Sequence, residues 1–235
     1  MKIQNSVALV TGANRGLGAA FARGLLAAGA AKVYAAARDP STVQLPGVAP
    51  VRLDVTHPEH AAALARELGD VTLLVNNAGI FEPGPLLEAG SVDALRRLVE
   101  TNAVGPLRLV QAFAPVLARN GGGAVVHVLS ALSWLTLPGT GAYSASKAAG
   151  WALGNALRQE LKAQRTELLA IHAAFIDTDM ARGAPGPKIA PEDVVRQALA
   201  TLEASRFELL ADDVTRGVKQ GFVAEPPVYV TGPKA

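Results

Sequence analysis

The chain has 235 residues, of which 50% are hydrophobic and 18% are charged, so it can bury a sizeable core and is not expected to be disordered. Its formal net charge of +2 is spread over scattered Lys and Arg side chains, which argues against a nucleic-acid partner. The absence of cysteine excludes disulfides and thiolate metal sites, and the four histidines fall on different predicted elements, so no metal site is predicted.

The sequence also bears on location and domain count. The apolar run near the start, residues 7–10, is too short for a signal peptide, and no stretch of about eighteen apolar residues suits a membrane span. We therefore expect a cytoplasmic protein with no membrane partner. No internal repeat or linker is present, so residues 1–235 are interpreted as one domain.

The first elements follow the order strand, glycine-rich turn, helix. Residues 6–10 are apolar and rich in valine, as in a strand buried on both faces, and an alanine-rich helical pattern ends near Gly29. Between them, residues 11–18 read Thr-Gly-Ala-Asn-Arg-Gly-Leu-Gly. Glycines let the backbone approach a ligand closely, and a helix N-terminus offers free N–H groups to an anion. This order favours a dinucleotide phosphate site over a merely tight turn.

The glycine spacing of this turn, Gly-x-x-x-Gly-x-Gly, differs from the Gly-x-Gly-x-x-Gly of long dehydrogenases. It resembles the short-chain dehydrogenase/reductase family, whose cofactor turn has this longer first gap. Together with the strand pattern, the resemblance implies an α/β fold: a single-domain, Rossmann-like, doubly wound parallel sheet of about seven strands, with helices on both faces. The turn residues expected to bind the cofactor are Gly12, Asn14, Arg15, Gly16, Leu17 and Gly18.

The second predicted strand, residues 32–37, ends where a dinucleotide fold places the adenosine ribose. An acidic residue there would accept from the 2′-hydroxyl of NAD, but this chain offers Arg38, with Asp39 one place too far on. Arg38 and Arg15 could fork onto a 2′-phosphate, so we predict a preference for NADP(H) over NAD(H). Two solvated surface arginines are the alternative.

Two further strands end in polar signatures. Residues 50–53 precede Asp54 and Val55, and in the resembling family an Asp-Val pair at this point meets the adenine. A helix-capping role for Asp54 or Thr56 is an equally simple account, because the next helix starts near Pro58. Residues 71–75 precede Asn-Asn-Ala-Gly, itself a family signature. Its expected cofactor contacts are Asn76, Ala78 and Gly79.

A long helical pattern begins at Ser91, its predicted cap, and runs to about residue 119. Pro106 and Pro115 are expected to bend or interrupt it. Asn102 lies within this pattern. In similar enzymes an asparagine at this place holds a water that links the catalytic lysine to solvent, so the resemblance implies that role for Asn102.

The fifth predicted strand, residues 124–129, delivers Ser130 at its carboxyl end, where ligands of doubly wound sheets bind. A hydroxyl there can donate to a substrate carbonyl oxygen and hold it against Tyr143. The interval between these two residues matches the spacing of the resembling family. As an isolated serine, Ser130 would be only a turn residue.

A helix is expected over residues 143–165, with Tyr143 and Lys147 on one face, one turn apart. An ammonium roughly 5 Å from the phenol, at an effective dielectric of about 20, favours the anion by about 3 kcal/mol and lowers its pKa by roughly two units. The phenol then becomes a plausible acid and base near neutrality. Such a pair also arises by chance, and the company of Ser130 and the glycine turn favours the chemical interpretation.

The alanines of this helix leave a smooth surface that suits close helix packing. In similar enzymes this helix and the preceding long one pair with their copies across a two-fold axis, so we expect a homodimer or homotetramer. Packing only within the monomer is the alternative.

After the sixth predicted strand, residues 168–173, the resembling family usually continues with Pro-Gly and then a threonine that contacts the nicotinamide carboxamide. Here Ala174 and Phe175 replace that turn, while Thr178 is retained, and Ile176 is also expected at the cofactor. Phenylalanine cannot easily take the backbone conformations open to glycine. Phe175 is therefore expected to redirect the chain or narrow the substrate pocket.

The last part of the chain is predicted to cover the substrate. Residues 182–188 read as a flexible loop, and residues 183–204 as a lid region that includes a helix over 191–204. A short strand over 207–210, a helix over 214–222 and an irregular tail over 223–235 complete the prediction.

The combined motifs imply an NADP(H)-dependent oxidoreductase that moves hydride between the nicotinamide and a carbonyl or alcohol. Ser130 and Tyr143 would hydrogen-bond the reacting oxygen, Lys147 would lower the Tyr143 pKa and bind the ribose, and Asn102 would complete the proton route. The predicted pocket favours a hydrophobic or aromatic ketone or aldehyde. Its expected lining is Phe81, Ala131, Leu132, Trp134, Leu135, Pro138, Phe175 and Met180. The alternative is a non-catalytic NADP(H)-binding sensor or assembly subunit.

Overall fold

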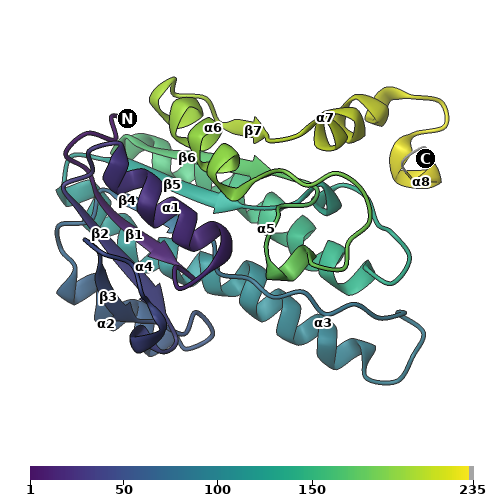
Figure 1. Ribbon diagram of the computed structural model, residues 1–235, viewed down its shortest axis with the longest axis horizontal. Helices are drawn as coiled ribbons and strands as arrows, with labels where there is room; N and C mark the ends of the chain where they lie inside the picture. The colour runs from purple at the N-terminus through teal and green to yellow at the C-terminus, as the bar shows by residue number, and fades with distance from the viewer. Residues whose placement is uncertain (233–235) are drawn as a thin grey trace.

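The structure, a computed structural model that describes residues 1–232, is built on one seven-stranded parallel sheet (Figure 1). The strands are β1 (Val7–Thr11), β2 (Lys32–Ala37), β3 (Ala49–Arg52), β4 (Leu73–Asn76), β5 (Gly123–Val128), β6 (Thr166–His172) and β7 (Glu208–Leu210). Their spatial order is β3-β2-β1-β4-β5-β6-β7, and every neighbouring pair is parallel. The predicted single-domain, doubly wound α/β fold is confirmed.

Helices cover both faces of the sheet. α1 (Gly16–Ala27) and α6 (Pro191–Glu203) lie on one face, where Phe21 and Val194 join the same buried cluster. α2 (Pro58–Glu67), α4 (Gly105–Arg119) and α5 (Gly141–Glu160) lie on the other, where Phe113 and Leu157 are buried. Within β1, Leu9 faces the second cluster and Val10 the first, so the strand is apolar on both sides.

The long helical pattern is broken into two helices. α3 (Ser91–Val99) leads through a π-helical turn (Glu100–Val104) into α4. The interruption therefore precedes Pro106, which takes an early position in α4 where a missing N–H is tolerated, while Pro115 lies inside that helix. The predicted cap is wrong: Gly90, with φ +87°, precedes the helix, and the Ser91 hydroxyl donates to the carbonyl of Leu86.

The C-terminal quarter corrects two further predictions. α6 belongs to the core, because Val194, Val195, Ala198 and Leu202 are buried on it, so the predicted lid does not include this helix. A lid formed by the loop before α6 stays a prediction. After α7 (Asp213–Gln220), the segment predicted as an irregular tail contains a short helix, α8 (Val228–Thr231). Residues 233–235 of that tail lie outside the described residues.

Candidate active site

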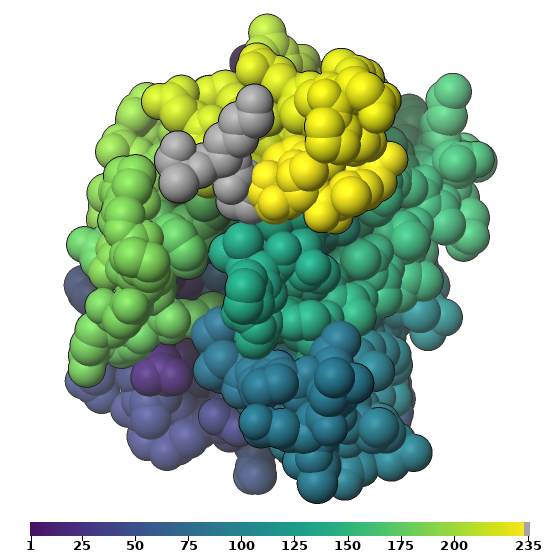
Figure 2. All heavy atoms as spheres, turned by 90° about the vertical axis from the view of Figure 1, so that its right-hand side faces the viewer, coloured from purple at the N-terminus to yellow at the C-terminus, as the bar shows by residue number. Residues whose placement is uncertain are grey.

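The predicted site residues gather at the carboxyl-end edge of the sheet. The glycine-rich turn follows β1, Ser130 follows β5, and Thr178 lies beyond the end of β6. Figure 2 looks onto this edge, where a small exposed part of the N-terminal, purple chain lies between the green segment around residues 180–190 and the blue segment before residue 100, with the yellow C-terminal helices at the top. Strand order reverses between β1 and β4, and ligands of doubly wound sheets bind beside such a reversal.

Ser130 is buried and held by backbone on both sides. Its Oγ accepts from the N–H of Leu132 at 3.1 Å, which caps a short 3₁₀ turn, and lies 3.4 Å from the carbonyl oxygen of Ala173. The ring of His172 contacts the Ser130 carbonyl oxygen through Nδ1 at 3.1 Å. Ser130 therefore belongs both to a turn and to the candidate site. The Ala173 carbonyl, directly after β6, helps to fix the position of its hydroxyl.

Tyr143 and Lys147 lie on α5, which begins at Gly141 and ends near the predicted limit after a 3₁₀ turn over Leu161–Gln164. Both side chains are buried, and Lys147 Nζ lies 5.8 Å from the centre of the Tyr143 ring. Lys147 Nζ also donates to the carbonyl oxygen of Val128 at 3.0 Å. This bond at the end of β5 fixes the lysine head beside the segment that carries Ser130.

The prediction of a lowered Tyr143 pKa is wrong. Burial of the phenol raises the pKa of Tyr143 to about 12, although the neighbouring Ser130 hydroxyl acts to lower it. Burial also lowers the pKa of Lys147 to about 8. The sequence estimate counted the attraction between the two charges but omitted the cost of removing each from water, which disfavours both charged forms. The phenol therefore keeps its proton at neutral pH.

Asn102 lies in the π-helical turn and is fully enclosed. Its side chain accepts from the N–H of Ile80 at 2.9 Å and donates to the Ile80 carbonyl at 3.0 Å and to Ser146 Oγ at 3.0 Å. The Ser146 hydroxyl in turn donates to the Tyr143 carbonyl at 2.7 Å. Asn102 thus ties the segment after β4 to α5. The predicted water-holding role stays a prediction.

Gly79 is required by this arrangement. A Cβ at Gly79 would lie 3.0 Å from Asn102 Oδ1 and 3.6 Å from Lys147 Nζ. The first distance is tighter than ordinary contact, so any larger residue would push the asparagine away from its partners. The backbone of the predicted family signature therefore passes directly beside Lys147.

The glycine turn is too tight for side chains at two of its three glycines. Gly12 has φ +63°, and a Cβ there would lie 3.1 Å from the Ala78 Cα. A Cβ at Gly18 would lie 2.1 Å from the Gly12 carbonyl oxygen, which no rearrangement of a side chain can relieve. Gly16, with φ +52°, faces Thr178 at 3.3 Å. The turn therefore lies close to the segments after both β4 and β6.

Helix α1 starts at this turn with its N-terminus open to the edge. Arg15 precedes it in an extended conformation with no capping side chain, and no acidic residue lies in its first turn. Leu17 is buried in the core and anchors the first turn, while Asn14 is half-buried. An uncapped N-terminus of a 12-residue helix beside a glycine cradle suits a phosphate group.

Asn77 ties this turn to the segment after β4, as a side-chain amide at the end of that strand can do, although it is not among the predicted site residues. Its Nδ2 donates to the carbonyl oxygen of Thr11 at 2.8 Å, and the Thr11 hydroxyl accepts from the N–H groups of Asn77 and Ala78, both at 2.9 Å. By contrast, the predicted contact Asn76 points toward α4, where its Nδ2 lies 3.4 Å from the Pro106 carbonyl. The sequence feature that could have indicated the Asn77 contact is Thr11, which places a side-chain hydroxyl at the end of β1.

Asp54 and Val55 lie at the adenine end of the expected site. Partial burial acts to raise the Asp54 pKa, but two hydrogen bonds from Thr56, at 3.0 and 2.7 Å, outweigh it and hold that pKa below its usual range. Asp54 therefore closes a local turn, whereas His57 takes the cap position of α2, so neither Asp54 nor Thr56 caps the helix. The Val55 carbonyl packs against Gly105, where a Cβ would lie 2.8 Å away.

The two arginines predicted to bind a 2′-phosphate are both exposed. Arg15 Nη1 lies 3.6 Å from Asp179 Oδ2, across the glycine turn in the 3₁₀ turn that follows Thr178. The charge of Arg38 contributes to the low pKa of Asp54, so the two side chains share one part of the edge. Their joint contact with a phosphate stays a prediction.

The segment after β6 folds back on itself. Ile176 pairs with Ile189, and the N–H of Ile189 donates to the Phe175 carbonyl at 2.9 Å. Phe175 is half-buried and is not among the described residues with positive φ, so it does not adopt a glycine-like conformation. Thr178 Oγ1 lies 3.3 Å from the Ile176 carbonyl.

The predicted substrate-pocket residues divide into two groups. Phe81 packs edge-on against the Tyr143 ring at 5.0 Å between centroids, and Leu132 joins the same cluster, so both lie beside the phenol. Trp134 and Leu135 instead belong to a buried cluster with Val218 of α7. The rest are placed as follows: Ala131 is buried, Pro138 is exposed, and Met180 is exposed in the loop after Thr178.

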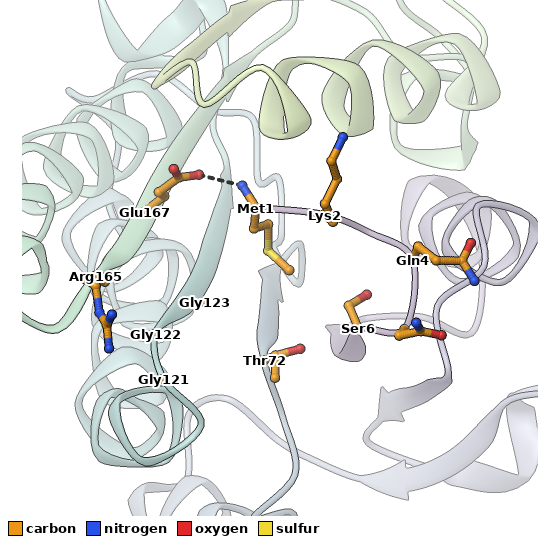
Figure 3. A pocket seen from close by; sticks show the side chains of 11 residues that line it. Met1, Lys2, Gln4, Ser6, Thr72, Gly121, Gly122, Gly123, Arg165 and Glu167 are labelled. Carbon is orange, nitrogen blue, oxygen red and sulfur yellow. Dashed lines mark hydrogen bonds and ion pairs between the residues drawn. The ribbon is translucent and has the colours of Figure 1, made fainter.

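Two hollows lie away from this site. One of about 370 Å³ is lined by residues such as Ser6, Thr72, Gly123 and Glu167, which stand at the opposite, amino-end edge of the sheet (Figure 3). Another of about 470 Å³ lies between α2 and α4. Among residues 1–232, no group of three or more His, Asp or Glu side chains is placed to hold a metal ion. Within the same range, none of the helices combines the length and apolar character needed to cross a bilayer.

Comparison with known proteins identifies the class of protein. The model of the short chain dehydrogenase family matches residues 6–186, so the chain belongs to that family. The dehydrogenase/reductase SDR family member 7B of Bos taurus is 34% identical to it, over 99% of this chain and 72% of the relative. A 3-oxoacyl-acyl-carrier-protein reductase of Vibrio cholerae is 31% identical, over 99% of this chain and 95% of that protein.

Solved structures agree with this assignment. A short chain dehydrogenase from Burkholderia cenocepacia in complex with NADP superposes with a TM-score of 0.91 and 40% identity, covering 96% of both chains. A short chain dehydrogenase/reductase from Burkholderia phymatum in complex with NAD gives a TM-score of 0.84 and 25% identity, covering 100% of this chain and 99% of that one.

Proposed function

We propose that this protein is an NADPH-dependent reductase of ketones or aldehydes. The observation that carries the proposal is the convergence of Ser130, Tyr143 and Lys147 at the carboxyl edge of the sheet, beside an open helix N-terminus and a glycine cradle. A dinucleotide-binding module has no need for these three side chains together. The family membership supports the same reaction class.

The cradle fits a nicotinamide dinucleotide. Gly12 and Gly18 let the turn pack closely on itself and against Ala78, and the uncapped start of α1 would hold the pyrophosphate. Arg15 and Arg38 would hold the 2′-phosphate, Asp54 and Val55 the adenine side, and Ile176 and Thr178 the nicotinamide side. When bound, the reduced nicotinamide supplies the hydride.

The side chains of this chain supply orientation and the proton. Ser130 and Tyr143 would hydrogen-bond the substrate oxygen, and the phenol would donate its proton to that oxygen as negative charge develops on it. Because burial raises the pKa of Tyr143 to about 12, the phenol holds its proton at neutral pH, as proton donation to a carbonyl oxygen requires. Lys147 would stabilise the phenolate left behind, and Asn102 would help return the proton.

Cofactor preference rests on charge at the ribose end. Arg38 stands where an NAD-specific site needs an acid, and the Burkholderia cenocepacia relative was solved with NADP. The Burkholderia phymatum relative was solved with NAD, so the preference of this protein for NADPH over NADH needs a direct measurement. We expect kcat/KM with NADPH to exceed that with NADH at least tenfold, and Arg38→Ala to remove most of the difference. Equal efficiencies in the wild type would contradict the preference.

The proposal extends to the substrate class, the assembly and the location of the protein. Phe81 and Leu132 beside the phenol favour a hydrophobic or aromatic carbonyl compound over a sugar. Ala145, Ala152 and Ala156 are exposed on α5, which suits a homodimer or homotetramer through α4 and α5. We also propose a cytoplasmic location.

A direct test compares two tyrosine variants. Tyr143→Phe removes the proton donor, so kcat for ketone reduction should fall at least a thousandfold while NADPH binding persists. Tyr34→Phe is the control, because its hydroxyl binds Lys32 and Asp70 on β2 and near β4, away from the site. A Tyr143→Phe enzyme with most of its activity would remove the proposed acid. A wild type that binds NADPH but reduces no member of a ketone and aldehyde panel would favour a non-catalytic sensor or assembly subunit.

A further inference from the structure

The peptide group between Ala173 and Ala174, at the end of β6, has polar contacts on both sides. Its carbonyl oxygen accepts from the N–H of Ala131 at 3.0 Å and lies 3.4 Å from Ser130 Oγ. Its N–H, on Ala174, donates to Asp212 Oδ2 at 2.8 Å. One peptide group therefore connects the Ser130 segment with a carboxylate.

Asp212 has a second partner. Its other oxygen, Oδ1, accepts from the N–H of Thr215 at 2.8 Å and so caps the N-terminus of α7. Asp212 lies just after β7. The residue before it, Ala211, continues the contact with β6, because its N–H donates to the His172 carbonyl at 2.9 Å. The half-buried carboxylate thus fastens α7 and the end of β6 to each other.

This contact exists because residue 174 is not proline. Proline has no N–H, so a chain with Pro-Gly at this point holds its backbone by ring stiffness instead. In this chain Ala174 is free to rotate about φ, and the charge-assisted bond to Asp212 supplies the restraint that the ring would have provided. Asp212 therefore compensates for the replaced turn.

The restrained segment is short and leads straight to the cofactor side. Beyond Ala174, the next backbone restraints are the pairing of Ile176 with Ile189 and the donation from Asp177 N–H to the Ile189 carbonyl at 2.9 Å. Thr178 then lies against Gly16 of the glycine turn. Without Asp212, the Ala174 N–H would lose its partner, and the segment would be held by the contacts of the Ala173 carbonyl at one end and by those on its loop side.

We propose that Asp212 is a positioning residue that holds residues 174–178 in place to receive the nicotinamide half of the cofactor. It acts through the Ala174 peptide and touches no reacting atom. This inference rests on the proposed function for the identity of the ligand, and on the observed contacts for the restraint itself.

The test uses Asp212→Ser, because serine can still cap α7 but is too short to reach Ala174 as well. Dissociation constants are measured for NADPH and for 2′,5′-ADP, which carries the adenosine half and no nicotinamide. NADPH should bind about fivefold more weakly to the variant, since the segment must be ordered on binding, while 2′,5′-ADP should bind unchanged. Equal weakening of both ligands, or of neither, would overturn the proposal.

Ala174→Pro provides the matched background. It removes the N–H that Asp212 binds and leaves the carboxylate and the cap intact. Asp212→Ser should then change NADPH affinity less than twofold in this background, because the two residues act through one bond. The same fivefold loss in both backgrounds would show that Asp212 acts by another route.

Hydrogen exchange tests the restraint without any ligand. The Ala174 amide should exchange at least tenfold faster in Asp212→Ser than in the wild type, while amides of β5 stay protected. Unchanged exchange at Ala174 would overturn the proposal. If the wild type binds neither NADPH nor 2′,5′-ADP, the proposed function fails, and the exchange result still decides whether Asp212 restrains the segment.

Discussion

Two segments face each other across the candidate site and are built in opposite ways. The glycine turn, residues 11–18, is held by close backbone contacts, and Gly18 has no room for even one carbon atom. The segment after β6, residues 174–190, is held by a few hydrogen bonds and by Asp212, and several of its side chains are exposed. The first can change little without losing its shape, whereas the second can vary in sequence as long as its tethers remain.

The largest effect should come from filling the glycine turn. Gly18→Ala places a Cβ 2.1 Å from the Gly12 carbonyl oxygen, so the turn must open. We expect a loss of about 3 kcal/mol in unfolding free energy and at least a hundredfold loss in NADPH affinity. Chemical denaturation and ligand titration measure the two.

The matched control for this change is Gly217→Ala on α7. Nothing lies within 4 Å of a Cβ there, and alanine is the better helix former, so stability should rise by up to about 1 kcal/mol. A Gly18→Ala protein as stable as this control, with normal NADPH affinity, would mean that the turn is not rigid and would break the contrast.

An intermediate effect should follow from acid, at β5 and β6, where His127 and His172 are buried. Burial lowers the pKa of His172 to about 4 from its usual 6.5, and its ring contacts the Ser130 carbonyl. The unfolded chain binds the proton more readily between these values, so stability should fall as pH drops from 6.5 toward 4, and His172 alone should contribute about 2 kcal/mol at pH 5.

Hydrogen exchange at pH 5 and pH 7 locates this acid effect. Amides of residues 130–134 and 172–174 should lose protection before those of the glycine turn, which contains no histidine. His172→Asn retains a donor without a titrating group and should lose part of the pH dependence. An unchanged pH dependence in that variant would assign the effect elsewhere, and the equally buried His127 would be examined next.

The smallest effect should come from the contact that joins the two segments. Arg15 and Asp179 are exposed and 3.6 Å apart, so their pairing is weak. Asp179→Asn should free Arg15 and tighten binding of 2′,5′-ADP by less than about threefold. Asp93→Asn, which breaks a comparable exposed pair with Arg96 on α3, should change nothing. A tenfold change from Asp179→Asn would make this pair a principal link between the segments.

Several features of fold and site could be predicted because they are local. A strand, a glycine turn and a helix lie next to each other in sequence, and four residues of helix set Tyr143 and Lys147 on one face. The Tyr143 pKa is raised where a lowered value was predicted, and this difference could not be predicted in the same way. The pKa depends on how completely the neighbouring helix and loops remove the phenol from water. The spacing of residues in the sequence does not indicate the degree of burial.

The helix predicted from Ser91 shows the same limit. Its apolar pattern is continuous, but a π-helical turn inserts at Asn102, whose side chain bonds Ile80 and Ser146 from distant parts of the chain. Likewise, the pattern of residues 191–203 indicates a helix but not whether it covers the substrate or the core. The packing of α6 against α1 in one buried cluster shows that this helix covers the core.

The amino-acid sequence alone was enough to determine the alternation of strands and helices, the parallel sheet, and the family to which the chain belongs, because each depends on short-range periodicity or on motifs of adjacent residues. Only the tertiary structure decided the protonation of Tyr143, the choice of Asn77 over Asn76 at the glycine turn, and the tether from Asp212 to Ala174. These depend on burial and on hydrogen bonds between residues far apart in the chain, and such partners meet only when the whole sheet has formed.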